Sequence, residues 1–491
     1  MTASETVLTD VPGGQPGKAD SDRPPIAVDL DGTLTLSDTL HEGIIGMLAH
    51  APGRAIELAS SLRAGKAAFK RQVAEGGEFD PAGLPYNEDL LAFLRTERAA
   101  GRRVGLFTAA DQSVADAVAA HLKLFDVVRG SNGTTNLSGE TKAAAIEAAF
   151  GPGFTYAGNG IVDLPIFARA ASVVLAGPVL SLRGKLAPDA KVEASFPVAP
   201  AGPWVWAHAL RLRHWPKNAL VFVAPVLSGQ ETALWLSIPL FVLFGVLSSA
   251  TYLLNDLADL VADRAHPKKR FRPLSSGAIP ARDGVLVAIA MIAMSLVAGA
   301  VLLPPGCVAV LAAYLVITLL YSSYFKQLPM IDVTVLAGLF TLRVLAGGTL
   351  VNAALSPWLH TFSMLFFLGL ATIKRYAELH RVGDTMVDGG TARGYGQQDK
   401  PILLATGVST GLSAIVIFMI YLINEQYPRA IYARPDLLWG IMPILLVWTL
   451  RLWHLAVNGL MSEDPVTFAL KDRFSLMAGG VIVLILIAAR L

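Results

Sequence analysis

Long apolar segments fill the chain from about residue 218 onward. A bilayer-spanning helix needs about 20 predominantly apolar residues. Lipid offers the backbone no hydrogen bonds, so such segments must be helical. The sequence therefore predicts an all-α polytopic membrane domain of about nine transmembrane helices over residues 211–491. The nine segments run approximately over 218–229, 232–254, 284–303, 306–322, 331–350, 357–373, 401–423, 437–455 and 474–490.

An acid-rich stretch, Leu254–Arg264, follows the second apolar segment. Asp256, Asp259 and Asp263 are three and four residues apart, so in a helix they share one face, with Asn255 beside them. Three carboxylates on one face repel one another and are costly to desolvate at a membrane. Mg²⁺ with oxygen ligands, often completed by substrate phosphates, neutralises such a group. The alternative is a solvated acidic helix end.

Residues 1 to about 200 have the composition of a soluble protein. Residues 1–24 are rich in Gly, Pro, Asp and Ser, which predicts a disordered tail. Helical, Ala-rich stretches then alternate with short apolar strands, a pattern typical of a parallel α/β sheet whose ligands bind at the carboxyl ends of the strands. The first expected strand lies in Ile26–Thr33 and is followed there by a tight turn. The other three are Arg103–Thr108, Phe154–Gly158 and Ser172–Leu175.

Four motifs in this α/β region are similar to those of the haloacid dehalogenase (HAD) superfamily. They are Asp29-Leu30-Asp31-Gly32-Thr33, Thr108, Lys142, and Gly158-Asn159-Gly160-Ile161-Val162-Asp163. The resemblance implies a phosphatase with a Rossmannoid sheet and a helical cap. It makes Asp29 the nucleophile and Asp31 the general acid and base. It also implies that Thr108 holds the phosphoryl oxygens and that Lys142 neutralises the charge between the nucleophile and the phosphate.

The same resemblance implies a Mg²⁺ site in the α/β region. Its ligands would be Asp29, Asp31, Asn159 and Asp163. Asn159 stands where an acid is more usual, and its amide oxygen brings less charge to a cation. A HAD domain with only a structural role is the alternative.

Motifs and composition predict the domain limits. Residues 25–180 form the expected HAD-like domain, and residues 181–210, which are rich in Pro and Ala, form the expected linker.

The placement of positive charge predicts the orientation in the membrane. The loops 257–282 and 374–400 are rich in Lys and Arg, whereas the connections 304–305 and 351–356 have neither. Positively charged loops face the cytoplasm. We therefore expect a multi-pass protein of the inner (plasma) membrane whose HAD domain and active sites are cytoplasmic.

The membrane region, about residues 210–491, resembles the UbiA superfamily of integral membrane prenyltransferases. Asn255, Asp256, Asp259 and Asp263 match its NDxxDxxxD signature, and the basic stretch Arg264–Pro273 also fits. Members of the family bind a diphosphate through Mg²⁺ held by these acids. The resemblance implies the same metal ligands and the same membrane location here.

Further motifs look like the decaprenyl-phosphate phosphoribosyltransferase branch of that family. They are Lys374-Arg375-Tyr376-Ala377-Glu378-Leu379, Tyr321-Ser322-Ser323-Tyr324-Phe325-Lys326, Asp332, Arg343 and Asp464-Pro465-Val466. The resemblance implies transfer of phosphoribose from phosphoribosyl diphosphate to a polyprenyl phosphate lipid. The candidate substrate-binding residues are Lys217, Arg264, Arg272, Tyr321, Lys326, Asp332, Arg343, Lys374, Arg375 and Glu378. Lys374 and Arg375 equally fit positive anchors at the membrane edge, and Arg343 fits a structural ion pair.

The two resemblances together suggest a bifunctional, Mg²⁺-dependent enzyme. The membrane region would make polyprenylphosphoryl-5-phosphoribose, and the HAD region would remove its 5-phosphate. One rival is a prenyltransferase with a prenyl diphosphate donor and an aromatic or other small acceptor, although the second DxxxD motif of such enzymes is replaced here by Lys374–Leu379. A membrane carrier or scaffold is a further rival. No nucleic-acid motif is present, and a single cysteine, Cys307, excludes an internal disulfide.

Overall fold

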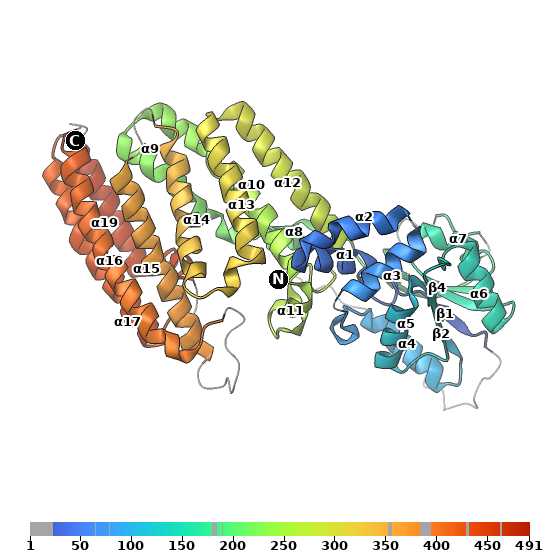
Figure 1. Ribbon diagram of the computed structural model, residues 1–491. Helices are drawn as coiled ribbons and strands as arrows, with labels where there is room; N and C mark the ends of the chain where they lie inside the picture. The colour runs from blue at the N-terminus through green and yellow to red at the C-terminus, as the bar shows by residue number, and fades with distance from the viewer. Residues whose placement is uncertain are drawn as a thin grey trace, which may run out of the picture. The chain divides into compact units, whose positions relative to one another are not determined.

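The computed structural model describes residues 23–491 except 64, 78, 179–183, 189, 352–355, 383–393, 429–431 and 462–463. Nearly all of the expected disordered tail, residues 1–24, lies outside the described residues. The chain divides into two compact units (Figure 1). The first contains residues up to Val205 together with Asp256–Asp283, and the second contains Trp206–Asn255 and Gly284–Leu491.

A six-stranded, wholly parallel sheet forms the centre of the first unit, with strand order β3-β2-β1-β4-β5-β6. β1, β4 and β5 are buried along their whole length, as expected for a parallel sheet covered on both faces. The strands are β1 (Ile26–Val28), β2 (Val104–Asp111), β3 (Val127–Ser131), β4 (Thr155–Gly158), β5 (Ser172–Gly177) and β6 (Val192–Pro197). The predicted α/β class is confirmed.

Two of these strands differ from the sequence-based expectation. β3 and β6 lie at the two edges of the sheet and are largely exposed or half-buried, so neither has the continuous apolar run that marked the other four. β6 falls within residues 181–210, which we expected to be a linker. The sheet therefore continues beyond residue 180, and its last strand pairs with β5.

Three helices inserted between β1 and β2 form the expected helical cap. Met47, Leu58 and Val73 make a small apolar core between them. The cap helices are α1 (Thr39–His50), α2 (Ala55–Arg63) and α3 (Lys66–Gly76). The other helices of the α/β region are α4 (Glu88–Ala99), α5 (Gln112–Leu122), α6 (Glu140–Phe150) and α7 (Leu164–Phe167), with a short 3-10 turn η2 (Pro81–Gly83).

The stretch Asp256–Asp283 packs on this α/β region, although its acids match the membrane signature. It contains α11 (Leu260–Ala265) and the 3-10 turn η6 (Lys269–Phe271). Gly277, at φ +74°, lies so close to Leu36 that an added Cβ would be 2.9 Å from the Leu36 Cβ. Glycine is therefore required both by the backbone and by the close approach.

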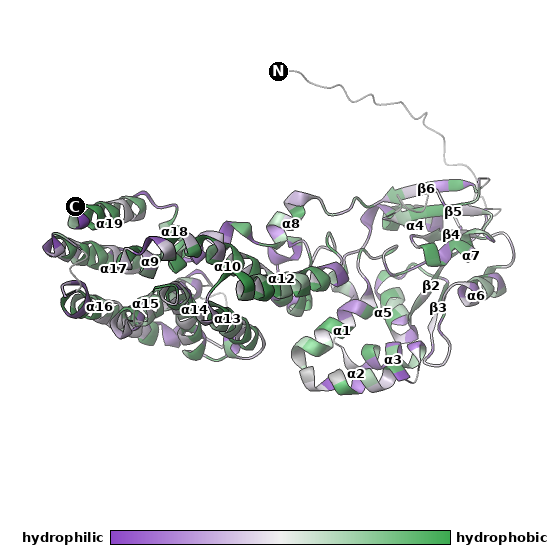
Figure 2. Cartoon of the chain, turned by 90° about the horizontal axis from the view of Figure 1, so that it is seen from above, coloured by the Kyte–Doolittle hydropathy of each residue, from purple (hydrophilic) through white to green (hydrophobic). Residues whose placement is uncertain are grey.

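The second unit is helical, and hydrophobic residues prevail along its helices (Figure 2). Two apolar cores hold the helices together, one around α14, α15, α16 and α17 and one around α10, α13 and α14. The long helices are α10 (Glu231–Ala258), α12 (Ala281–Leu302), α13 (Pro305–Ser323), α14 (Ile331–Gly348), α15 (Pro357–Val382), α16 (Lys400–Tyr421), α17 (Ile441–Val457) and α19 (Arg473–Arg490). The short elements are α8 (Pro203–Ala209), η5 (Leu212–Phe222), α9 (Val223–Ser228), η7 (Phe325–Gln327) and α18 (Pro465–Ala469).

Seven helical stretches in the described part of the chain are long and apolar enough to cross a membrane. The expected number of about nine is therefore too high by this measure. The segment 218–229 forms the end of η5, which contains Pro216, and the short helix α9, which ends at Gly229 in the left-handed conformation. The segment 357–373 lies in α15, a helix of 26 residues whose apolar run is broken by polar side chains. The seven stretches are Glu231–Ala258, Ala281–Leu302, Pro305–Ser323, Ile331–Gly348, Gln397–Gln426, Pro435–Val457 and Arg473–Arg490.

Candidate functional site

Lys142 connects the predicted catalytic groups of the α/β region. Its side chain is 3% exposed, and its Nζ lies 2.8 Å from Asp29 Oδ1 and 3.5 Å from Asp163 Oδ1. Tyr156 OH accepts from Lys142 at 3.2 Å and donates to Asp163 Oδ1 at 3.0 Å. These groups come from the ends of β1 and β4, from α6 and from the turn after β4. The fold thus gathers two other motif residues, Asp29 and Asp163, around the buried ammonium of Lys142.

Asp31 lies on the turn that follows β1. The backbone N–H of Thr39, at the start of cap helix α1, donates to Asp31 Oδ1 at 2.8 Å. Gly32 has φ +72°, and a Cβ at this position would overlap the side chain of Asn159. The Asn159 amide therefore lies against the Asp29–Thr33 turn. This closeness is what a shared Mg²⁺ site of Asp29, Asp31 and Asn159 would require.

Burial controls the charge of this centre. Desolvation raises the pKa of Asp29 to about 6, although Lys142 lowers it, and raises the pKa of Asp31 to about 7. Carboxylates that are desolvated in this way are stabilised by a cation. The donor atoms of Asp29, Asp31, Asn159 and Asp163 are all oxygens, which fit Mg²⁺. Within the described residues no group of three or more His, Cys, Asp or Glu is arranged to hold a metal ion, so this ligand set stays a prediction.

Thr108 and Lys70 lie near the end of β2. Thr108 is fully buried, and its Oγ1 accepts from Ala110 N at 3.0 Å. Lys70, from cap helix α3, donates to Ala109 O at 2.6 Å and to Asn136 Oδ1 at 2.7 Å. Burial lowers the pKa of Lys70, and the charge of Asp31 is the largest influence that raises it. Lys70 and Tyr156 were missed from the sequence, because neither belongs to a motif and their partners are distant in the chain.

Arg272 bridges two acids of the NDxxDxxxD signature. Its Nη1 lies 3.0 Å from Asp256 Oδ1 and 2.5 Å from Asp263 Oδ2, and Lys269 Nζ is 3.5 Å from Asp263 Oδ1. Asp256 and Asp263 are only 4% and 1% exposed. Two buried carboxylates thus share the positive charge that Arg272 and Lys269 supply. Their oxygens also suit Mg²⁺ chemically.

The expectation that the three acids share one continuous helix face is wrong. α10 ends at Ala258, and Asp259 has a non-helical backbone (φ −96°, ψ 12°) before α11 begins. Aspartate favours helix ends because its side chain competes with the helical hydrogen bonds. Asn255, the last residue of the first segment of the second unit, lies within α10. The metal-binding role of Asn255, Asp256, Asp259 and Asp263 stays a prediction.

A shared carboxylate joins two predicted phosphate-binding lysines in the second unit. Asp464, at the start of α18, lies 3.1 Å from Lys217 Nζ and 3.3 Å from Lys374 Nζ. Burial alone would raise the pKa of Asp464, but the two lysines lower it. The group carries a net positive charge, and its members come from η5, α15 and the turn before α18. We call Lys217, Lys374 and Asp464 the lysine pair site.

Arg375 is held by two carboxylates next to this group. Its Nη2 lies 2.5 Å from Asp332 Oδ2, its Nη1 donates to Glu378, and Tyr395 OH donates to Asp332. Arg375 and Asp332 are almost completely buried. A buried pair of this kind fixes the facing positions of α14 and α15. The predicted residues Arg375, Asp332 and Glu378 are therefore brought together.

The remaining substrate-binding candidates lie elsewhere. Arg343, in α14, donates to Asn218 Oδ1 at 2.8 Å, Leu339 O at 2.6 Å and Tyr314 OH at 3.1 Å, which fits a structural role. Arg264 binds Glu42 of the cap. Tyr321, near the end of α13, and Lys326, in η7, are half-buried. Contact of Arg343, Arg264, Arg272, Tyr321 and Lys326 with substrate stays a prediction.

The helices of membrane-spanning length and the clusters of buried charged residues indicate the class of protein. It is an integral membrane enzyme with an N-terminal domain built on a parallel α/β sheet. Residues 218–459 match the UbiA prenyltransferase family, and residues 26–168 match the haloacid dehalogenase-like hydrolases. "Uncharacterized protein y4nM" of Sinorhizobium fredii is 38% identical over 469 residues, which are 93% of this chain and 89% of that protein. The chain belongs to the UbiA prenyltransferase family and carries an N-terminal HAD-like domain.

Two further similarities concern parts of the chain. Decaprenyl-phosphate phosphoribosyltransferase of Corynebacterium glutamicum is 38% identical over 180 residues, 35% of this chain and 53% of that protein. A UbiA homolog from Archaeoglobus fulgidus, solved bound to GPP and Mg²⁺, aligns with a TM-score of 0.45 at 17% identity. That alignment covers 58% of this chain and 98% of the homolog.

Proposed function

We propose that the protein transfers 5-phosphoribose from phosphoribosyl diphosphate to a polyprenyl phosphate and then removes the 5-phosphate to leave polyprenylphosphoryl-ribose. The observation that carries the proposal is the lysine pair site, in which Lys374 of the Lys374–Leu379 motif shares Asp464 with Lys217. The motifs that contain Lys374 and Asp464, Lys374–Leu379 and Asp464-Pro465-Val466, both resemble the phosphoribosyltransferase branch in sequence. The likeness to a relative named decaprenyl-phosphate phosphoribosyltransferase supports the same choice.

The lysine pair site has the chemistry of a phosphate-binding group. Two ammonium groups on one carboxylate leave one positive charge for an anion, and charge-assisted hydrogen bonds to phosphate are among the strongest in proteins. Asp464 keeps Lys217 and Lys374 close together despite their mutual repulsion. The neighbouring Arg375 is already paired with Asp332. We assign the two lysines to a phosphate of the donor or acceptor, and Arg375 with Asp332 to the positioning of α15.

The acids of the NDxxDxxxD signature are assigned to the diphosphate. Asp256, Asp259 and Asp263 would hold Mg²⁺, which supplies positive charge to the leaving diphosphate when bound. Arg272 and Lys269, now paired with the acids, would turn to the phosphate oxygens. Transfer breaks the bond between ribose C1 and the diphosphate and forms a bond from C1 to the lipid phosphate oxygen.

The phosphatase step is assigned to the α/β region. Asp29 attacks the 5-phosphate phosphorus, and an aspartyl phosphate forms as the ribose 5-oxygen leaves with a proton from Asp31. Water, deprotonated by Asp31, then releases inorganic phosphate and restores Asp29. A pKa of about 7 at Asp31 suits a group that must give and take a proton near neutral pH. Lys142 neutralises charge beside the nucleophile, and Mg²⁺, when bound, would stabilise the phosphoryl oxygens.

We also propose that both centres face the cytoplasm at the inner membrane. The basic loop 257–282 contains Asp259, Asp263 and Arg272 of the proposed diphosphate site, and the basic loop 374–400 begins with Lys374 of the lysine pair site. The positive-inside rule places such loops on the cytoplasmic side. Phosphoribosyl diphosphate, a soluble and highly charged donor, would reach the protein from that side.

A product assay tests the proposal. The purified full-length protein is incubated in detergent with phosphoribosyl diphosphate, Mg²⁺ and a polyprenyl phosphate, and the lipids are identified by mass spectrometry. We expect a ribosyl lipid without its 5-phosphate. Asp29→Asn should accumulate the phosphorylated ribosyl lipid, and Asp256→Asn should form no ribosyl lipid.

Two outcomes would contradict the proposal. A phosphorylated ribosyl lipid as the only product of the wild-type protein would remove the phosphatase step. No ribosyl lipid, together with prenylation of an aromatic acceptor from a prenyl diphosphate, would replace the transferase assignment by its rival.

A further inference from the structure

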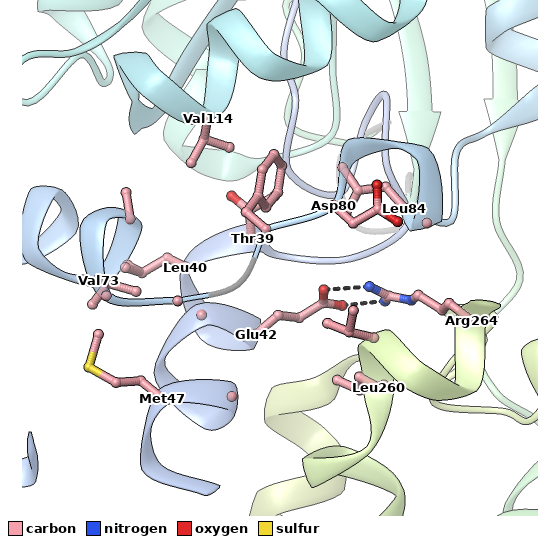
Figure 3. Close-up of a pocket in the computed structure, with 18 of the residues that line it drawn as sticks. Thr39, Leu40, Glu42, Met47, Val73, Asp80, Leu84, Val114, Leu260 and Arg264 are labelled. Carbon is pink, nitrogen blue, oxygen red and sulfur yellow. Dashed lines mark hydrogen bonds and ion pairs between the residues drawn. The ribbon is translucent and has the colours of Figure 1, made fainter. Parts of the chain in front are cut away.

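A cavity of about 520 Å³ lies in the first unit, within the size range of ligand sites. Figure 3 shows cap residues Leu40, Met47 and Val73 on one side and Leu260 with Arg264 on the other. Its walls come from α1 and α3 of the cap, from η2, from the end of β2 and from residues 257–265. The last stretch belongs to the segment that contains the NDxxDxxxD acids.

The cavity adjoins the phosphatase centre through two of its lining residues. Thr39 lines it and donates its backbone N–H to Asp31 Oδ1 at 2.8 Å. Lys70 lines it and donates to Ala109 O, the residue after Thr108. A phosphate ester whose phosphoryl group lies at Asp29 therefore has its leaving group directed toward this space.

The lining is amphipathic. Cap residues Leu40, Met47 and Val73 face apolar residues of α10 and α11, among them Leu257 and Leu260. Asp111, at the end of β2, lines the same cavity and is 3% exposed. Its Oδ1 accepts from Ser113, whereas its Oδ2 has no hydrogen-bond partner in the described part of the chain. A buried acceptor without a partner is costly, and a rotation of the Asp111 side chain would present this oxygen to a hydroxyl donor of a ligand in the cavity.

Lys70 adds a positive charge to the same wall. Its hydrogen bonds to Ala109 and Asn136 use two of the three N–H donors of an ammonium. A small soluble phosphate ester has no apolar surface that could pack against the apolar wall. A ligand that combines a sugar, a phosphodiester and an isoprenoid chain matches all three kinds of lining group.

We propose that this cavity binds the ribose and the first isoprenoid units of a lipid-linked phosphoribose while its 5-phosphate lies at Asp29. Asp111 Oδ2 accepts from a ribose hydroxyl, Lys70 faces the phosphodiester, and the isoprenoid carbons contact Leu40, Val73 and Leu260. The inference rests on the proposed function and deepens it, because it makes the phosphatase selective for a lipid-linked substrate. The wall formed by residues 257–265 explains why the membrane signature and the phosphatase occur in one chain.

Gly46 provides a direct test. It lies in α1 and lines the cavity, and a Cβ added there meets no described atom within 4 Å. Gly46→Phe therefore fills the cavity without a clash at Cβ. The matched control is Gly53→Phe, also in the cap and also open at Cβ, but outside the cavity lining. Both variants and the wild type are assayed as full-length protein with synthetic farnesylphosphoryl-5-phosphoribose and with acetyl phosphate, which is too small to reach the apolar wall.

We expect Gly46→Phe to lower the ratio of kcat/KM for the prenyl substrate to kcat/KM for acetyl phosphate at least about tenfold. Gly53→Phe should keep the wild-type ratio. If Gly46→Phe loses both activities, Val261→Trp decides, because Val261 lines the opposite wall and is 44% exposed. It should produce the same fall in the ratio.

The outcomes separate the two hypotheses. If the wild type hydrolyses both substrates and the cavity variants keep its ratio, the cavity proposal is wrong and the proposed function stands. If the wild type hydrolyses acetyl phosphate only, a lipid-linked substrate is wrong both for the proposed function and for the cavity proposal. If it hydrolyses neither, the phosphatase assignment fails and the cavity proposal fails with it.

Discussion

The lysine pair site makes a prediction at the scale of single residues. Replacing Lys374 by Met removes one of the two ammonium groups that share Asp464. Because a phosphate would lose one charge-assisted contact, we expect the transferase kcat/KM for phosphoribosyl diphosphate or polyprenyl phosphate to fall at least about tenfold. Initial rates with each substrate varied in turn measure the effect and show which phosphate Lys374 binds.

Lys471→Met is the matched control for this change. It removes the same charge from an exposed position next to the end of α18. The control should keep the wild-type rate constants. Equal losses in both variants would show that the protein responds to net charge and not to a phosphate contact at Lys374.

The meeting of the HAD-like motifs could be predicted from the sequence, whereas the residues that support them could not. Asp29 and Asp31 follow the first expected strand and Asn159 follows the third, so a parallel sheet predicts that they lie at the same end. The catalytic roles of these residues stay predictions. Tyr156 belongs to no such motif, and a tyrosine in a buried strand usually serves packing. Lys70 is one of several lysines and arginines on a polar cap helix, and its contact with Ala109 spans 39 residues. A contact between residues so far apart in the sequence depends on how the cap packs, and the local sequence pattern does not encode this packing.

At the scale of elements, close helix packing depends on Gly407 in α16. A Cβ at this position would lie less than 3.0 Å from the Trp453 ring of α17 and from Thr372 Oγ1 of α15. Small residues allow membrane helices to approach each other in this way. We expect Gly407→Ala to destabilise the protein by about 2 kcal/mol, because overpacking forces the helices apart. Thermal unfolding in detergent should show a lower Tm.

Gly480→Ala in α19 tests whether this loss comes from overpacking. An added Cβ at Gly480 meets no described atom within 4 Å. Since alanine is the better helix former, this variant should keep or slightly raise the Tm. A lower Tm in both variants would point to a general requirement for glycine in these helices.

The ion pair between Glu42 and Arg264 gives a second prediction for elements. Arg264 Nη1 and Nη2 donate to the two carboxylate oxygens of Glu42 at 2.7 and 2.5 Å, which joins α1 of the cap to α11 (Figure 3). Both side chains are largely buried. Removing one partner leaves the other charge buried and unpaired, so Glu42→Gln should cost about 3 kcal/mol or more at this contact. Hydrogen exchange of residues 260–280 should accelerate.

The exposed pair between Arg54 and Glu57 supplies the control. Glu57→Gln makes the same chemical change on cap helix α2, where both partners are exposed. Surface pairs contribute about 0–1 kcal/mol, so exchange of residues 260–280 should not change. Unchanged exchange in Glu42→Gln would show that α11 is held on the cap by apolar contacts alone.

The secondary structure could be predicted where an element has a long run of apolar residues, as in strands buried on both faces of the sheet and in helices of the membrane unit. The four central strands are continuous apolar runs, whereas β3 and β6 are edge strands in which polar residues such as Arg129 and Glu193 interrupt the pattern. The apolar segments predicted the long helices, but hydropathy alone could not decide whether α15 spans the membrane. Its packing between α14 and α16 explains why a helix with polar ends persists in the membrane unit.

At the scale of the whole molecule, the packing of Asp256–Asp283 on the cap would link the two proposed activities. The segment contains three of the acids assigned to the proposed transferase, and part of it lines the cavity proposed to bind the phosphatase substrate. A lipid intermediate made at these acids would be available to the phosphatase of the same chain at a high effective concentration. We therefore expect transfer within one chain to be faster than transfer between chains.

A mixture of two inactivated proteins tests this expectation. Asp29→Asn lacks the proposed phosphatase and Asp256→Asn the proposed transferase, so their mixture forms polyprenylphosphoryl-ribose only if the intermediate moves between chains. In dilute detergent solution we expect the mixture to form it at less than about one tenth of the wild-type rate, and the rate should rise with protein concentration. The matched control is wild type diluted with an equal amount of the double variant, which should keep half of the rate. A mixture as fast as this control at every dilution would mean that the intermediate is released before it is dephosphorylated, and the fusion would then serve joint expression or localisation instead of direct transfer.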